Sequence, residues 1–256
     1  MRTIRWLSIS LLAASLALAV GCAQRGRVDA ASTAAVAGDR IGEVVVTPVE
    51  HASLLLSWRG KTLYVDPVGG GELYRGLPAP DLILITHLHP DHMSAETLAA
   101  IGGHAPIVAP SSVKAALPAE LGARIHVLAN GESATVAGIP IRAIPAYNTT
   151  PERLQYHPKG RDNGYVLTFA DAQVYIAGDT EDIPEMRALR NIDVAFVPMN
   201  LPYTMTEQQA ASAVREFKPR IVYPYHSRGS DVAEFARLVG TDSGVEVRLR
   251  DWYPAR

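Results

Sequence analysis

The chain has 256 residues, of which 48% are hydrophobic and 20% charged, and its formal net charge at pH 7 is −2. This composition is typical of a globular protein with a full core, and it excludes a disordered or fibrous chain. The 24 lysines and arginines are scattered rather than gathered in a stripe. We therefore expect one α/β domain and no nucleic-acid partner.

The N-terminal segment has the order of a signal peptide. Arg2 and Arg5 precede an apolar run over 7–20, and small residues lead to Cys22, the single cysteine of the chain. The segment resembles a bacterial lipoprotein signal in which Cys22 is lipidated, and the alternatives are plain secretion or an uncleaved anchor. We expect a lipid-anchored protein of the bacterial cell envelope that faces the periplasm or the exterior. Any metal site must then use His, Asp, Glu and water.

Composition divides the chain into 1–22 as signal peptide, 23–40 as a flexible tether and 41–256 as the folded domain. The wholly apolar run 82–85 predicts a buried strand, and Ser94 is the expected N-cap of a helix that follows it. A second helix is expected to begin after Thr206 and to stop at 218–219. Short β-rich runs predict further strands at 43–48, 53–58, 62–65, 107–109, 124–128, 141–144, 165–169, 174–176, 194–198 and 221–223.

A dense polar cluster, Thr86-His87-Leu88-His89-Pro90-Asp91-His92, follows the buried strand. His87 and His89 are spaced to point at one cation. Asp91 and His92 can turn to a neighbouring position about 3.5–4 Å away, as in two-metal sites. Solvated surface polarity is the alternative, but this spacing directly behind a buried strand favours a metal centre.

The cluster resembles the HxHxDH motif of the metallo-β-lactamase superfamily, and the resemblance covers about 43–252. Within the superfamily the chain looks like the metal-dependent hydrolases related to ascorbate-6-phosphate lactonase. The segments that carry this likeness are His51-Ala52-Ser53, Asp66-Pro67 and Gly178-Asp179-Thr180. The resemblance implies a four-layer αββα sandwich with a dinuclear metal centre at one edge of its two sheets.

By the same resemblance, Asp179 matches the carboxylate that bridges both metals, and His226 matches the last ligand, beside Asp91 and His92. Read alone, Asp179 could be a turn residue and His226 a core histidine. The third ligand of the first site departs from the family pattern, because Tyr147 and Asn148 stand where many members have a histidine. His157 is the nearest later histidine, and it could bind metal, contact substrate or be solvated.

Two further residues are expected close to the ligands. Asp66 is interpreted as the acceptor of a hydrogen bond from a ligand imidazole or from the cluster loop, with a turn role as the alternative. His51 is expected to line the pocket, with a buried structural imidazole as the alternative. His104 and His126 have no such context, and we expect both at the surface.

These residues favour a metal-dependent hydrolase in which a metal-bound hydroxide cleaves an ester, lactone or phosphoester bond of a small molecule or lipid head group. We expect two divalent metal ions, Zn²⁺ first and Mn²⁺ or Fe²⁺ as alternatives. Asp91 could shuttle the proton, and Tyr147, Asn148 or His157 could hold the developing oxyanion. A non-catalytic metal-binding lipoprotein and a β-lactam-hydrolysing enzyme are the alternative functions.

Overall fold

The computed structural model describes residues 38–170 and 172–253. Cys22, the predicted signal peptide and the tether up to residue 37 lie outside the described residues. The first strand begins at Asp39 and pairs with the next strand of the chain. This strand thus begins two residues before Ile41, near which the sequence analysis expects the folded domain to start.

The fold has two sheets of seven strands each. In both sheets the strands lie in the order of the chain, so each strand pairs with its sequence neighbours. The first sheet contains β1 (Asp39–Ile41), β2 (Val44–Glu50), β3 (Ser53–Trp58), β4 (Lys61–Val65), β5 (Leu82–Leu84), β6 (Ile107–Ala109) and β7 (Ile125–Val127). The second contains β8 (Ser133–Val136), β9 (Ile139–Ala146), β10 (Asp162–Thr168), β11 (Gln173–Ile176), β12 (Val194–Pro198), β13 (Ile221–Tyr225) and β14 (Glu246–Val247).

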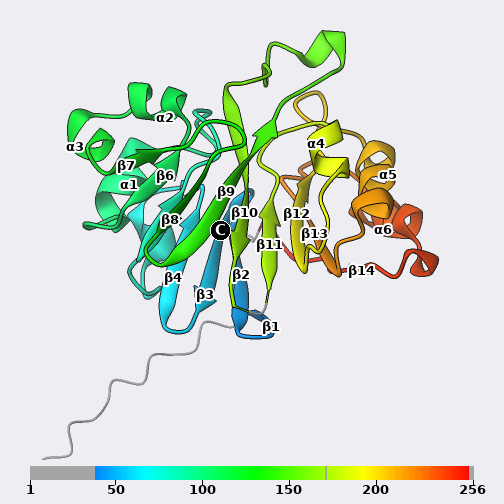
Figure 1. Ribbon diagram of the computed structural model, residues 1–256, viewed down its shortest axis with the longest axis horizontal. Helices are drawn as coiled ribbons and strands as arrows, with labels where there is room; N and C mark the ends of the chain where they lie inside the picture. Colours follow the sequence, from blue (N-terminus) through cyan, green and yellow to red (C-terminus); the bar gives the residue numbers. More distant parts are fainter. Residues whose placement is uncertain (1–37, 171, 254–256) are drawn as a thin grey trace, which may run out of the picture. The chain divides into compact units, whose positions relative to one another are not determined.

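Helices cover the outer face of each sheet (Figure 1). Beside the first sheet lie α1 (Ala95–Ile101), α2 (Ser111–Ala116) and α3 (Ala119–Gly122). Beside the second lie α4 (Pro184–Arg187), α5 (Glu207–Phe217) and α6 (Val232–Val239). Short 3₁₀ turns occur at η1 (Gly71–Tyr74), η2 (Pro151–Arg153) and η3 (Thr241–Ser243). The expected four-layer αββα sandwich is thereby confirmed, and no helix of the described residues is long and apolar enough to span a membrane.

The apolar core has three parts, one between the sheets and one under each helical layer. The segment of strand β5 contributes side chains to two of these three parts. Leu82 and Leu84 pack between the sheets, whereas Ile83 and Ile85 pack against α1–α3. Successive side chains of a strand point to opposite faces, so a strand covered on both faces must be apolar throughout. This explains why the runs that end at the polar clusters show no alternation.

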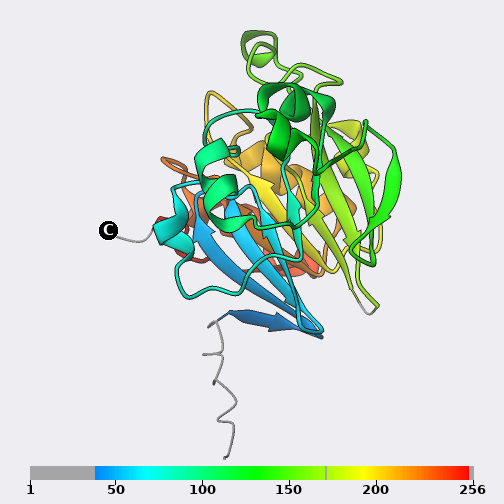
Figure 2. The ribbon, with the colours of Figure 1, turned by 90° about the vertical axis from the view of Figure 1, so that its left-hand side faces the viewer.

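The strand directions bring the polar clusters to one end of the sheets. Strands β4 and β5 are parallel, and β11, β12 and β13 are parallel to one another. Loops that follow their carboxyl ends carry Asp66, the His87–His92 cluster, Asp179 and His226. The turned view in Figure 2 shows these strands running toward the same end of the sandwich. Carboxyl ends of parallel strands are where α/β sheets place their sites.

Two helix starts confirm the sequence expectations. The Ser94 side chain accepts a hydrogen bond from the Thr97 N–H at the start of α1. Thr206 and Gln209 form a reciprocal capping box at the start of α5. Helix α5 ends at Phe217, and its C-cap Lys218 adopts the left-handed conformation before Pro219.

Candidate metal centre

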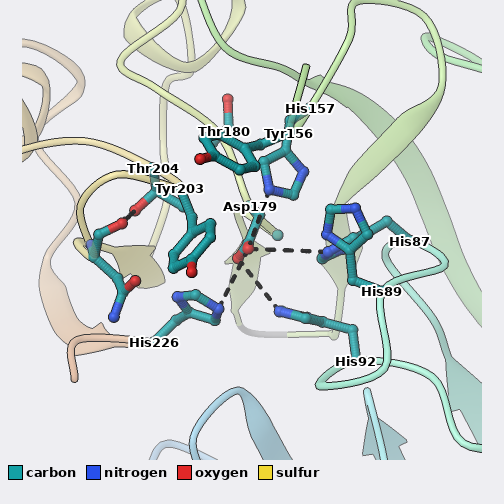
Figure 3. Close-up of polar contacts among 12 residues, drawn as sticks. His87, His89, His92, Tyr156, His157, Asp179, Thr180, Tyr203, Thr204 and His226 are labelled. Carbon is teal, nitrogen blue, oxygen red and sulfur yellow. Dashed lines mark hydrogen bonds and ion pairs between the residues drawn. The ribbon is translucent and has the colours of Figure 1, made fainter. Parts of the chain in front are cut away.

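Imidazoles from separate loops surround the carboxylate of Asp179, which is 2% exposed (Figure 3). The Nε2 atom of His226 lies 3.3 Å from Asp179 Oδ2, and that of His92 lies 3.4 Å from Oδ1. The Nε2 atoms of His157 and His87 lie 3.4 Å and 3.9 Å from Oδ2. Residues that are far apart in the sequence therefore meet at one carboxylate.

The possible ligands fall into two main groups, which a smaller overlapping group links through Asp179. His87, His89 and His157 offer nitrogen atoms within 4.8 Å of one another. His51, Asp91, His92 and His226 form a second group by the same measure, and a third group joins Asp179 to His87 and His92. The structure thus brings His157 to His87 and His89, as the metal-ligand alternative for His157 requires, and it places Asp179 where a bridging carboxylate would stand.

Several atoms of this cluster are buried without a hydrogen-bond partner. They are His87 Nε2, His92 Nε2, both ring nitrogens of His226 and Asp179 Oδ1. A buried polar atom that lacks a partner costs about 1–3 kcal/mol. Neutral imidazole nitrogens and a carboxylate oxygen are good ligands for divalent metals. The donor set therefore fits a metal ion held among these atoms.

Asp66 holds the cluster loop and one ligand ring from behind, as the sequence indicated. The carboxylate is fully buried and lies 2.8 Å from His92 Nδ1. The Asp66 carboxylate also accepts hydrogen bonds from the backbone N–H of Thr86, at 2.8 Å, and from the Thr86 hydroxyl, at 2.7 Å. An Nδ1–H that donates to Asp66 leaves His92 Nε2 free to bind metal. The same carboxylate thus sets both the tautomer of the ring and the position of the loop.

His157 has a similar partner that the sequence analysis did not identify. Its Nδ1 lies 3.1 Å from Oδ2 of Asp162, the first residue of β10. Arg161 donates to both oxygens of Asp162, at 2.7 and 2.8 Å, and its Nη2 also lies 3.4 Å from His89 Nε2. The only sequence signal was the position of Arg161-Asp162 shortly before the apolar run 165–167. Asp162 orients His157 as Asp66 orients His92.

A buried carboxylate, Glu181, fixes the loop that carries His157. Its Oε2 accepts hydrogen bonds from the backbone N–H groups of Thr149 and Thr150, at 2.7 and 2.8 Å, and from the Thr149 hydroxyl, at 2.6 Å. Its Oε1 accepts from Arg153 Nη1 at 2.8 Å. We call the segment 147–161 the His157 loop. Because Glu181 follows Asp179 by two residues, it ties this loop to the segment that carries Asp179.

The expectation that Tyr147 or Asn148 holds an oxyanion was wrong. The Tyr147 ring belongs to the core under α4–α6, and its hydroxyl donates to Glu185 at 2.9 Å. The side-chain amide of Asn148 donates to the carbonyl oxygens of Arg153 and Tyr203, at 3.1 and 2.7 Å. Both side chains are therefore committed to the scaffold of the His157 loop.

His51 lies closer to the ligands than the sequence suggested. Its Nε2 is 3.3 Å from Asp91 Oδ2, and its ring centre is 3.9 Å from that of His226. Its Nδ1 is 2.9 Å from the hydroxyl of Tyr253. His51 both lines a pocket and belongs to the second ligand group. His104 and His126 are exposed, as expected.

Gly178 allows Asp179 to approach the cluster. It has a φ of +65°, and a Cβ there would lie 2.9 Å from the carbonyl oxygen of Asn163 and 3.1 Å from Thr86 Cβ. Any larger residue would be strained and would collide with the backbone of β10. The Gly-Asp order after β11 thus has a steric reason.

Charges within the cluster favour a cation at its centre. Burial opposes ionisation of Asp179, but the imidazoles of His226 and His92 outweigh burial and hold the pKa of this carboxyl well below its usual value. Burial also opposes a charge on His92, yet Asp179 and Asp66 raise the pKa of His92 well above its usual value. Burial lowers the pKa of His87 well below its usual value, so that ring is neutral. A metal ion can replace the proton of His92 as the positive charge that the carboxylates favour.

The fold and this cluster define the class of the protein, an αββα sandwich with a metal-binding end. A family model described as a beta-lactamase superfamily domain matches residues 45–226. The chain therefore belongs to the β-lactamase superfamily, as the HxHxDH motif predicted, and it is a metal-dependent hydrolase. The finer resemblance to ascorbate-6-phosphate lactonase stays a prediction.

Named relatives support this assignment. A UPF0173 metal-dependent hydrolase of Thermococcus kodakarensis is 30% identical over 210 residues, which cover 77% of this chain and 92% of the relative. A crystal structure from Parabacteroides distasonis, also named as a metal-dependent hydrolase, is 45% identical with a TM-score of 0.75, and the match covers 82% of this chain and 94% of that one. Igni18, a metallo hydrolase of Ignicoccus hospitalis, shares the fold with a TM-score of 0.68 at 24% identity, over 82% of this chain and 96% of that one.

Proposed function

We propose that this metal-dependent hydrolase holds two divalent metal ions and cleaves an ester, lactone or phosphoester bond of a small molecule. The observation that carries the proposal is the convergence of buried, unpartnered imidazole nitrogens on Asp179. His87, His89 and His157 would hold one ion, and Asp91, His92 and His226 the other, with Asp179 between them. The imidazole-rich set suits Zn²⁺, and the carboxylates leave Mn²⁺ or Fe²⁺ as alternatives.

The chain's own residues supply the other parts of a hydrolytic mechanism. When bound, two metal ions lower the pKa of a water molecule and polarise the bond to be cleaved. The Asp91 side chain is 48% exposed, and its Oδ2 lies 3.3 Å from His51 Nε2. It can therefore accept a proton at the open side of the centre and pass it to His51. Asp66 and Asp162 keep the rings of His92 and His157 in fixed orientations.

The proposal is tested by metal analysis followed by a substrate screen. Metal content per chain is measured on the purified protein, and the loaded protein is then assayed with lactones, phosphodiesters, lipid head groups and β-lactams. About two ions per chain and turnover of an ester or phosphoester support the proposal. A single tightly bound ion without turnover would instead support a non-catalytic metal-binding protein.

The Asp179→Ala variant is the internal check of the same experiment. We expect it to lose metal and turnover together, because Asp179 contacts the imidazoles of both ligand groups. Hydrolysis by this variant at the wild-type rate would show that the activity does not come from this centre.

We also propose that Cys22 carries a lipid that anchors the enzyme to the bacterial cell envelope. The support is the order of charged, apolar and small residues before this cysteine. An anchor would bring the centre close to a membrane, where lipid head groups are available as substrates. The screen therefore includes them.

A further inference from the structure

Two pockets lie against the candidate metal centre and share part of their walls. The shared residues are Pro90, Asp91, Tyr203 and His226. The first pocket, of about 350 Å³, is also lined by His89, Tyr156, His157 and Asp179. The second, of about 390 Å³, is lined in addition by Glu50, His51, Val68, Gly69, Asn200 and Arg228. A molecule bound across both would meet the possible metal ligands at one end and Arg228 at the other.

Arg228 differs from the other arginines near the centre because no carboxylate of the described residues forms an ion pair with it. Its guanidinium carbon lies 4.6 Å from the centre of the Tyr253 ring. Arg153 and Arg161, in contrast, are paired with the buried carboxylates of Glu181 and Asp162. An exposed arginine stacked on an aromatic ring keeps its N–H donors available for an anion.

The support of Arg228 is itself tied to the metal end. The Tyr253 hydroxyl accepts a hydrogen bond from the Ser227 N–H at 2.8 Å and lies 2.9 Å from His51 Nδ1. The carbonyl oxygen of Arg228 accepts from Asn200 Nδ2 at 2.6 Å. The backbone and the ring under the guanidinium are therefore held in place, which lowers the entropic cost of binding.

We propose that Arg228 binds an anionic group of the substrate, a carboxylate or a phosphate, while the bond to be cleaved lies beside Asp179. This inference rests on the proposed hydrolase function. A guanidinium forms paired hydrogen bonds with both kinds of anion. Tyr203 and Tyr156, with ring centres 5.0 Å apart, supply an aromatic wall between the two ends.

The test uses two substrates that differ only in charge. One is an ester or lactone with a remote carboxylate, and the other carries a carboxamide at the same position. We expect Arg228→Ala to lower kcat/KM for the carboxylate by about 10- to 100-fold, mainly through KM, and to change it less than about twofold for the carboxamide. Arg228→Lys should retain part of the preference. A third substrate, with a phosphate in place of the remote carboxylate, shows which anion is preferred.

The control variant is Arg220→Ala, which removes the same charge at the opposite end of β13, where Arg220 lies 3.4 Å from Asp193. Equal loss on both substrates, or an equal effect of Arg220→Ala, would overturn the inference. If the wild-type protein cleaves neither substrate, titration with inorganic phosphate decides the matter without turnover. Weaker phosphate binding by Arg228→Ala than by the wild type, at unchanged metal content, would support the anion site even though the proposed type of cleaved bond was wrong. Phosphate binding equal to that of the wild type would refute the site.

Discussion

At the scale of single residues, the centre depends on carboxylates that touch no substrate. Asp66 and Asp162 each accept from the Nδ1 of a histidine whose Nε2 points at Asp179. A ring held in this way presents its free nitrogen in one direction, so the ligand geometry exists before a metal arrives. Ligand rings without such partners would lose rotational freedom on binding.

We therefore predict that Asp66→Asn lowers metal affinity about 10- to 100-fold. An amide of the same shape still fills the space, but it brings no charge to His92 and can present its NH₂ group to Nδ1. Competition with a chromogenic chelator measures the affinity. Asp193→Asn, at the opposite end of the second sheet, is the control, and equal affinities of Asp66→Asn and wild type would contradict the role of Asp66.

At the scale of elements, the His157 loop contains a single 3₁₀ turn, yet side-chain hydrogen bonds hold it at several points. Glu181 accepts from Thr149, Thr150 and Arg153, while the Asn148 N–H donates to the carbonyl oxygen of His157 at 2.8 Å. A loop with a single 3₁₀ turn is thus fixed by side chains rather than by a helix or sheet.

We predict that Glu181→Gln weakens metal binding in the group of His87, His89 and His157 more than in the other group. Removal of the charge leaves the buried N–H groups of the loop with a poorer acceptor, so the loop places His157 less accurately. Stepwise Co²⁺ titration, followed by absorbance, separates a first from a second binding event.

Two comparisons make this prediction specific. The double variant Glu181→Gln/His157→Ala should be no worse than His157→Ala alone, because Glu181 acts through His157. Glu216→Gln, which changes an exposed partner of Arg187, should titrate as wild type. Additive losses in the double variant would mean that Glu181 acts on the centre by another route.

The strands and loops that carry the possible ligands explain why the sequence predicted some of these ligands and not others. The HxHxDH cluster, Asp179 and His226 each follow a wholly apolar strand, so their place at the carboxyl ends of the strands could be predicted. His157 lies in a loop without periodicity, and its position depends on contacts with Asp162 and on the hydrogen bonds that Glu181, far along the chain, makes to the same loop. The roles given to Tyr147 and Asn148 failed because chain position does not show which way a side chain points.

Elements with a complete apolar run or cap were predictable, but the shortest helices and the last strand were not. Strands β3 and β12 and helix α5 lie close to their expected bounds, because their apolar runs and caps are complete. Helices α2, α3 and α4 have six residues or fewer, which is less than two turns and too short for a helical period to emerge. Strand β14 has two residues and is defined by pairing with β13 alone.

At the scale of the whole molecule, the three apolar core clusters contain none of the residues proposed as metal ligands. We therefore predict that the chain stays folded after chelation but melts at a lower temperature. An ion at about 100 times its Kd adds about 2.7 kcal/mol to the free energy of unfolding. For a domain of this size that corresponds to a shift in Tm of roughly 5–11 °C.

Calorimetry with chelator and with added Zn²⁺ measures this shift. Asp179→Ala should melt at the same temperature in both conditions, since it lacks the carboxylate that we propose to lie between the two ions. Identical melting of the wild-type protein with and without metal would contradict a bound ion, and loss of the folded state on chelation would make the metal a structural element.

The last prediction concerns where the folded domain is held, and it uses the full chain. If Cys22 carries a lipid, Cys22→Ser should move the protein from the membrane fraction to the soluble fraction, because a thioether-linked lipid cannot form on serine. The domain that begins at Asp39 should keep its metal content and turnover, since the change lies outside it. Fractionation followed by immunoblotting measures the shift, and an extracted wild-type sample provides the activity control. Membrane association that is equal in variant and wild type would rule out lipidation at Cys22 as the anchor and leave an uncleaved apolar segment, residues 7–20, in its place.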